Sequence, residues 1–113
     1  MQAVGSKNPV LVTLKVKPGK KQAMIDLLNT PDGLQATRDY DGSLSLEAFF
    51  NDETYTYYIY GDWASYDHYQ KYLDWRFNDD ESKLAQSVIA LCEGGEKGLT
   101  PIFPNTDYSS FNN

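Results

Sequence analysis

Cysteine and histidine are almost absent from this chain, which has one of each among its 113 residues. A single cysteine, Cys92, cannot form an intramolecular disulfide. Cys92 and the single histidine, His68, also supply too few ligands for the usual kind of zinc site. The sequence therefore predicts no disulfide framework and no metal centre. Because Cys92 falls on the apolar face of an expected helix, we expect a buried, unreactive thiol.

Long apolar runs and an excess of basic residues are missing as well. No apolar run approaches the ~20 residues that span a bilayer, and residues 1–9 lack the apolar segment of a secretory signal. Ten Lys and Arg stand against sixteen Asp and Glu, a net charge of −6. A surface of that sign repels phosphate backbones. We therefore expect a cytoplasmic protein that binds neither membranes nor nucleic acid.

Apolar and aromatic residues are present in sufficient number for one folded core. Hydrophobic residues make up 41% of the chain and aromatic residues 14%, which argues against global disorder. The length suits one domain and is too short for two. We predict a single domain with its core at about residues 9–104 and with terminal extensions at 1–8 and 105–113.

The segment from residue 37 to residue 72 predicts a β-hairpin that leads into a helix. Two alternating runs flank a turn at residues 51–53, and Ser65 has the character of a helix N-cap. The first run places Leu44, Leu46, Ala48 and Phe50 on one face, which we expect to be buried. The second run places Tyr55, Tyr57 and Ile59 on one face and Tyr58 and Tyr60 on the other. Such a second aromatic face suits a partner subunit or a ligand cavity, or else tyrosines on an exposed sheet.

The remaining pattern completes an alternation of strands and helices. The other expected elements are a strand over residues 10–17, a helix over 20–28, a short helical segment over 31–38, a helix with an acidic start at 78–81, and an edge strand within 97–104. With the hairpin and its helix, the order is strand, helix, strand, strand, helix, strand. This order predicts an α+β fold, the ferredoxin-like split βαβ with an antiparallel sheet.

Three short motifs carry a resemblance to a known family. They are Val16-Lys17-Pro18-Gly19, Thr37-Arg38 followed by the segment Asp41–Glu47, and Trp63-Ala64-Ser65. In order and spacing these motifs resemble the antibiotic biosynthesis monooxygenase-like (ABM) domains of the dimeric α/β-barrel superfamily. The resemblance implies a homodimer that closes a barrel, with a pocket between the sheet and the helices of one subunit. It also implies oxidation of quinols or polyphenols by molecular oxygen, without a cofactor.

Candidate site residues follow from the resemblance and from side-chain chemistry. His68 is the candidate catalytic base, because its unperturbed pKa suits proton transfer near neutral pH; a surface or packing role is the alternative. The candidate substrate-binding residues are Trp63, Tyr69, Tyr72, Tyr58, Tyr60 and Arg38. Structural alternatives stand beside them: Trp63 in the core, Tyr72 at a dimer seam, and Arg38 in a surface ion pair.

The sequence also departs from the family pattern. The histidine that the family commonly carries nine residues after the strand-ending tryptophan falls on Tyr72. Val12 stands where the haem-degrading branch needs asparagine, which disfavours haem degradation. Two functions therefore compete: a cofactor-independent monooxygenase of a small aromatic substrate, and a non-catalytic ligand-binding or dimerisation module on the same fold.

Overall fold

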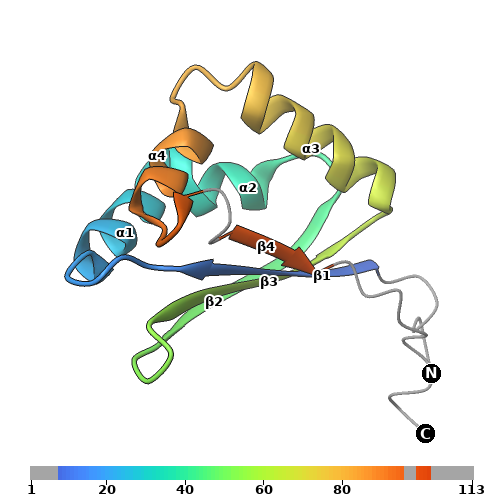
Figure 1. Ribbon diagram of the computed structural model, residues 1–113. Helices are drawn as coiled ribbons and strands as arrows, with labels where there is room; N and C mark the ends of the chain where they lie inside the picture. The colour runs from blue at the N-terminus through green and yellow to red at the C-terminus, as the bar shows by residue number, and fades with distance from the viewer. Residues whose placement is uncertain (1–7, 96–98, 103–113) are drawn as a thin grey trace, which may run out of the picture.

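A computed structural model describes residues 8–95 and 99–102, in which the helices cover one face of a single sheet (Figure 1). The elements are β1 (Asn8–Lys15), α1 (Lys21–Leu28), η2 (Pro31–Gln35), α2 (Ala36–Asp39), β2 (Ser43–Asn51), β3 (Thr56–Trp63), α3 (Tyr66–Asn78), α4 (Leu84–Leu91) and β4 (Leu99–Ile102). All strand pairs are antiparallel, and the strand order is β2-β3-β1-β4. The predicted ferredoxin-like α+β fold is confirmed.

The two faces of β3 differ as the alternation predicts. Tyr57 and Trp63 point toward the helices and are buried, whereas Tyr60 on the opposite face is 36% exposed. Tyr55 lies before the strand, and its hydroxyl accepts hydrogen bonds from the backbone N–H groups of Gly19 and Lys21, each at 3.2 Å. This tyrosine therefore fastens the hairpin turn to the start of α1.

Strand β2 follows its predicted alternation except at Leu44. The register shifts between Ser43 and Ser45, so that Leu44 forms a β-bulge and is 60% exposed. A bulge places one extra residue in the strand and turns its side chain away from the regular face. The expectation of a buried Leu44 is thus wrong, while Ala48 and Phe50 do pack against the core.

The sequence predicted that the acidic segment 78–81 begins the next helix, but this prediction is wrong. Asn78 ends α3, residues 79–83 form a loop, and α4 begins at Leu84 after Lys83 in a left-handed conformation with φ of 58°. The reason is that the Asp80 carboxylate bonds to Arg76 and Ser82, so that it does not cap a helix.

The core lies between the sheet and the helices in two clusters. The larger cluster comprises Leu14, Val16, Met24, Leu28, Tyr57, Leu84, Val88 and Cys92, and the smaller comprises Val10, Trp63 and Tyr69. Cys92 is fully buried, as expected, and burial raises the pKa of its thiol, which keeps the thiol in its unreactive protonated form.

The edge strand β4 pairs with β1, with Pro101 opposite Val12. A proline is tolerated at this position because β4 is the last strand of the described sheet and has a partner on one side only. The tail from residue 105 and the extension before residue 8 lie outside the described residues. None of the described helices is long and apolar enough to cross a bilayer.

Candidate functional site: a cavity between the sheet and the helices

A cavity of about 460 Å³ lies between the inner face of the sheet and the helices. Aliphatic side chains of β1, β3 and α4 form much of its wall, including Val12, Ile59 and Ala85. Phe77 of α3 also lines the cavity and is 42% exposed, which places this ring where the cavity approaches the surface. The site is therefore a mostly apolar space within the single chain.

Three of the predicted substrate-binding residues meet in this wall: Trp63, Tyr69 and Tyr72. The Trp63 ring centroid lies 5.3 Å from that of Tyr69 and 5.2 Å from that of Tyr72, typical spacings for interacting aromatic rings. Burial, with a smaller contribution from Tyr72, raises the pKa of the Tyr69 phenol far above its ordinary value. Tyr69 is therefore a neutral phenol at physiological pH.

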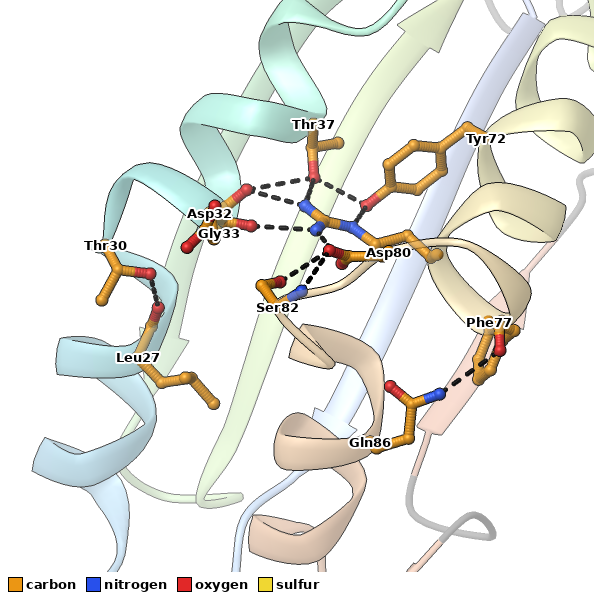
Figure 2. A network of polar contacts seen from close by, with 11 residues as sticks. Leu27, Thr30, Asp32, Gly33, Thr37, Tyr72, Phe77, Asp80, Ser82 and Gln86 are labelled. Carbon is orange, nitrogen blue, oxygen red and sulfur yellow. Dashed lines mark hydrogen bonds and ion pairs between the residues drawn. The ribbon is translucent and has the colours of Figure 1, made fainter.

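Thr37, Tyr72 and Arg76 form the polar corner of the cavity, and all three line its wall. Arg76 Nε donates to the Tyr72 hydroxyl at 2.8 Å, and Arg76 Nη2 donates to Thr37 Oγ1 at 2.9 Å. The two hydroxyl oxygens are themselves 2.6 Å apart and share a hydrogen bond. Figure 2 shows the Tyr72 ring of α3 reaching across to Thr37 of α2. The corner thus joins two elements that are far apart in the sequence.

The Arg76 guanidinium is buried, at 3% exposure, and all five of its N–H groups have acceptors. Besides the two hydroxyls, its acceptors are the carbonyl oxygen of Asp32 at 2.9 Å, the carbonyl oxygen of Gly33 at 2.8 Å, and Asp80 Oδ2 at 2.8 Å. Figure 2 shows Asp32 and Gly33 of η2 and Asp80 of the loop after α3 gathered around this network. With every donor used inside the protein, Arg76 has no N–H left for a ligand.

Asp80 balances the charge of Arg76 inside the protein. Burial alone would raise the pKa of the Asp80 carboxyl, but hydrogen bonds from Ser82 and Arg76 and the charge of Arg76 outweigh it and hold the pKa below its usual value. Both the backbone N–H and the hydroxyl of Ser82 donate to Asp80 Oδ1, at 3.0 and 2.7 Å. The ion pair is therefore complete and carries no net charge.

His68 lies at the beginning of α3, outside the residues that line the cavity. Its Nδ1 is 2.7 Å from Ser65 Oγ, which also accepts a hydrogen bond from the His68 backbone N–H and so confirms Ser65 as the N-cap. Its Nε2 is 3.9 Å from Asp41 Oδ2. Gly42, with φ of 94°, packs so closely on the imidazole that a Cβ there would overlap the ring.

The structure does not bring Tyr58, Tyr60 and Arg38 to the cavity. Tyr58 and Tyr60 project from the opposite, helix-free face of the sheet, where the Tyr58 ring stacks on Phe49 at a centroid distance of 5.2 Å. Arg38 is exposed in α2. These three side chains therefore lie away from the cavity.

The polar corner includes two residues that were not predicted from the sequence as site residues. Arg76 was not singled out, and Thr37 was named only as part of a motif. A signal was present in the four-residue spacing of Tyr72, Arg76 and Asp80, which places an aromatic, a cation and a carboxylate on one side of α3 and the loop after it. That spacing is ordinary on exposed helices, which is why it does not by itself indicate a buried site. Among the described residues, no group of three or more His, Cys, Asp or Glu side chains could hold a metal ion.

Family models and curated protein sequences give no match to this chain. Several solved structures, however, match it. A conserved protein from Methanosarcina mazei superposes with a TM-score of 0.69 at 13% identity, covering 88% of this chain and 91% of its own. A dimeric ferredoxin-like protein of unknown function from Jannaschia has a TM-score of 0.66 at 14% identity, covering 85% and 95%.

A third solved structure is named an antibiotic biosynthesis monooxygenase. It superposes with a TM-score of 0.66 at 13% identity, covering 87% of this chain and 96% of that one. At such low identity the likeness establishes the fold alone. The resemblance predicted from the sequence is confirmed at the level of the fold: the chain has a ferredoxin-like fold, which it shares with the solved structure named an antibiotic biosynthesis monooxygenase.

Proposed function

We propose that this chain binds a small planar aromatic molecule in the cavity and oxidises it as a cofactor-independent monooxygenase of quinol- or polyphenol-type substrates. The observation that carries the proposal is an apolar, aromatic-walled cavity of about 460 Å³ with a single polar corner. That volume lies within the range of sites for small organic ligands. The solved structure named an antibiotic biosynthesis monooxygenase, which shares the fold, supports the choice of reaction.

The reaction needs no bound cofactor when the substrate supplies the electrons. Anthrone is a suitable probe, because its enol tautomer is a polycyclic phenol. After loss of a proton, the anion passes an electron to O2; one oxygen atom becomes a carbonyl at the methylene carbon, and the other leaves in water with the two methylene hydrogens. The four electrons that reduce O2 come from anthrone, which becomes anthraquinone. The protein contributes orientation and exclusion of water, and His68 is our proposed base.

A second candidate, binding without turnover, is favoured by two features of the site. His68 lies outside the cavity wall, and the donors of Arg76 are fully used within the protein. Oxygen uptake with anthrone separates the candidates. Uptake above the spontaneous rate, reduced about a hundredfold or more in His68→Ala, supports the enzyme and its base. Anthrone binding with no added oxygen uptake eliminates the monooxygenase.

Filling the cavity from α4 should weaken ligand binding. We expect Ala85→Phe to weaken anthrone binding at least tenfold, because Ala85 is buried and lines the cavity, so that the added ring occupies ligand volume. Equilibrium dialysis under argon measures the affinity without oxidation. The matched control is Ala90→Phe on the exposed side of the same helix. Equal affinities of Ala85→Phe and the wild type would place the ligand elsewhere.

We further propose a homodimer that pairs the helix-free faces of two sheets. This face carries Phe49, which is 54% exposed, together with Tyr58 and Tyr60. An exposed aromatic cluster of this kind is typical of an interaction surface. The dimeric ferredoxin-like protein that shares the fold supports this reading. The partner surface is on the side of the sheet away from the cavity.

A charge on the helix-free face should dissociate that dimer. For the wild type, light scattering should give twice the chain mass of 12.8 kDa. Phe49→Glu should shift the mass toward the monomer and raise the dissociation constant at least tenfold, because a carboxylate would be buried without a partner. Ala90→Glu, on the helix layer, serves as the control. A monomeric wild type, or a Phe49→Glu variant that stays dimeric, argues against this interface.

A further inference from the structure

The two hydroxyl groups of the polar corner have more protons than well-placed protein acceptors. Arg76 donates one N–H to the Tyr72 oxygen and one to Thr37 Oγ1. One hydroxyl proton fills the 2.6 Å contact between Tyr72 and Thr37. Among the described residues, the remaining proton has a single protein acceptor within reach, the Gly33 carbonyl oxygen, 3.4 Å from Thr37 Oγ1.

That acceptor is already engaged. The Gly33 carbonyl oxygen receives a hydrogen bond from Arg76 Nη2 at 2.8 Å, and a 3.4 Å contact is long for a hydroxyl donor. If Thr37 instead donates to Tyr72, the Tyr72 proton is released toward the cavity that both residues line. The corner can therefore present one O–H donor to a bound molecule without losing any hydrogen bond shorter than 3.4 Å.

The charge state of the corner restricts what that donor recognises. The guanidinium of Arg76 is 2.8 Å from Asp80 Oδ2, and both side chains are almost fully buried, at 3% and 5% exposure. The pair is neutral as a whole, and the rest of the wall is mostly apolar. Burying a ligand carboxylate here would cost solvation with no unpaired cation to offset it. The site thus favours binding of a neutral acceptor over binding of an anion; in the proposed reaction the anion forms only after the neutral substrate has bound.

We propose that the Tyr72 hydroxyl is the specificity-determining donor of the cavity, and that the ligand is a neutral planar aromatic molecule that offers one oxygen acceptor, such as a ketone or quinone carbonyl. This proposal rests on the proposed function, because it assumes that the cavity binds an aromatic ligand. Arg76 and Thr37 act through Tyr72 as positioning residues. They orient its oxygen and turn its proton toward the cavity.

A matched pair of probes tests the donor directly. Fluorene and 9-fluorenone differ only by CH2 against C=O, and equilibrium dialysis gives a dissociation constant for each. We define the carbonyl preference as the ratio of the fluorene constant to the fluorenone constant. We expect Tyr72→Phe to lower this preference about tenfold, the value of one good hydrogen bond, and to change fluorene affinity less than twofold. Tyr40→Phe is the control, because the Tyr40 hydroxyl bonds to the Lys71 carbonyl oxygen at 3.3 Å and is not part of the cavity wall.

Other binding results would contradict the role of Tyr72 or the preference for a neutral ligand. A carbonyl preference that is unchanged in Tyr72→Phe, including the case in which both probes lose affinity by the same factor, overturns the role of Tyr72 while ligand binding in the cavity stands. Failure of both probes to bind the wild type overturns this inference, whereas the anthrone assay decides the proposed function separately. The charge requirement is tested with 9-fluorenone-4-carboxamide and the corresponding carboxylate: the carboxylate should bind at least tenfold more weakly, and tighter binding would contradict a neutral ligand.

A spectroscopic measurement keeps the proposal testable if Tyr72→Phe does not fold. The carbonyl stretch of 9-fluorenone moves to lower frequency when the oxygen accepts a hydrogen bond. Bound to the wild type, the probe should show this shift relative to the same probe in an alkane. In a folded Tyr72→Phe variant the shift should disappear, which a purely structural role of Tyr72 would not cause. A bound carbonyl that absorbs at the alkane frequency in the wild type overturns the proposal.

Discussion

Replacing Arg76 by methionine is expected to lower the free energy of unfolding by about 3–5 kcal/mol, as for other buried ion pairs that lose one partner. Methionine fills a similar volume but leaves the Asp80 carboxylate buried without its cation. It also leaves the carbonyl oxygens of Asp32 and Gly33 without their donors. Urea unfolding of purified protein, followed by circular dichroism at pH 7, measures the change.

Arg38→Met provides the matched control for this experiment. Arg38 is exposed in α2, so its replacement should change the free energy of unfolding by no more than about 0.5 kcal/mol. The double variant Arg76→Met with Asp80→Leu should recover part of the loss, because it removes both buried charges. A loss below about 1 kcal/mol in Arg76→Met alone would show that the network contributes little to stability.

Replacing Asp80 by asparagine should cost about 3 kcal/mol at pH 7, and this cost should shrink in acid. The folded-state pKa of Asp80 is lowered, whereas the unfolded chain has a carboxyl pKa of about 3.9. Below pH 4 the unfolded state therefore binds more protons, and the wild type loses this stabilisation as the pH falls through the lower, folded pKa. Asparagine has no such proton to bind, so the two unfolding free energies should converge.

Urea titrations at pH 7 and at about pH 3 give the difference at each end of this range. Asp79→Asn is the control, because Asp79 is the neighbouring carboxylate and is exposed. It should be as stable as the wild type at pH 7. A stability gap between Asp80→Asn and the wild type that stays constant from pH 7 to pH 3 would contradict the protonation mechanism.

The fold was accessible from sequence because its main signals are local. The two-residue alternation of β3 sorts Tyr57 and Tyr60 onto opposite faces, and the structure confirms that sorting. Ser65 caps α3 with its own side chain, a contact that depends on residues three positions apart. In each case the physical cause lies within a few residues, which is the range that a single sequence reports well.

The polar corner was not accessible, because its causes are long-range. Arg76 looks like a solvent-facing residue of an amphipathic helix, and arginine is seldom fully buried unless it is paired. What buries it is a set of acceptors supplied by Asp32, Gly33 and Thr37, about forty positions earlier in the chain. The same limitation explains why Leu44 was wrongly predicted to be buried. A bulge is a property of strand pairing and cannot be predicted from the alternation of one strand.

The polar corner and the apolar wall of the cavity should differ in how freely their residues can be substituted. Arg76 is held by backbone carbonyl oxygens, which persist whatever side chains occupy those positions. Wall residues such as Ala85 and Ile89 are ordinary positions on α4, where a change of size alters the space for a ligand. Under the proposed function, substitutions there would change which molecule fits the cavity, while the Tyr72 donor that we propose stays in place. A designer who wanted a new ligand would therefore begin with α4.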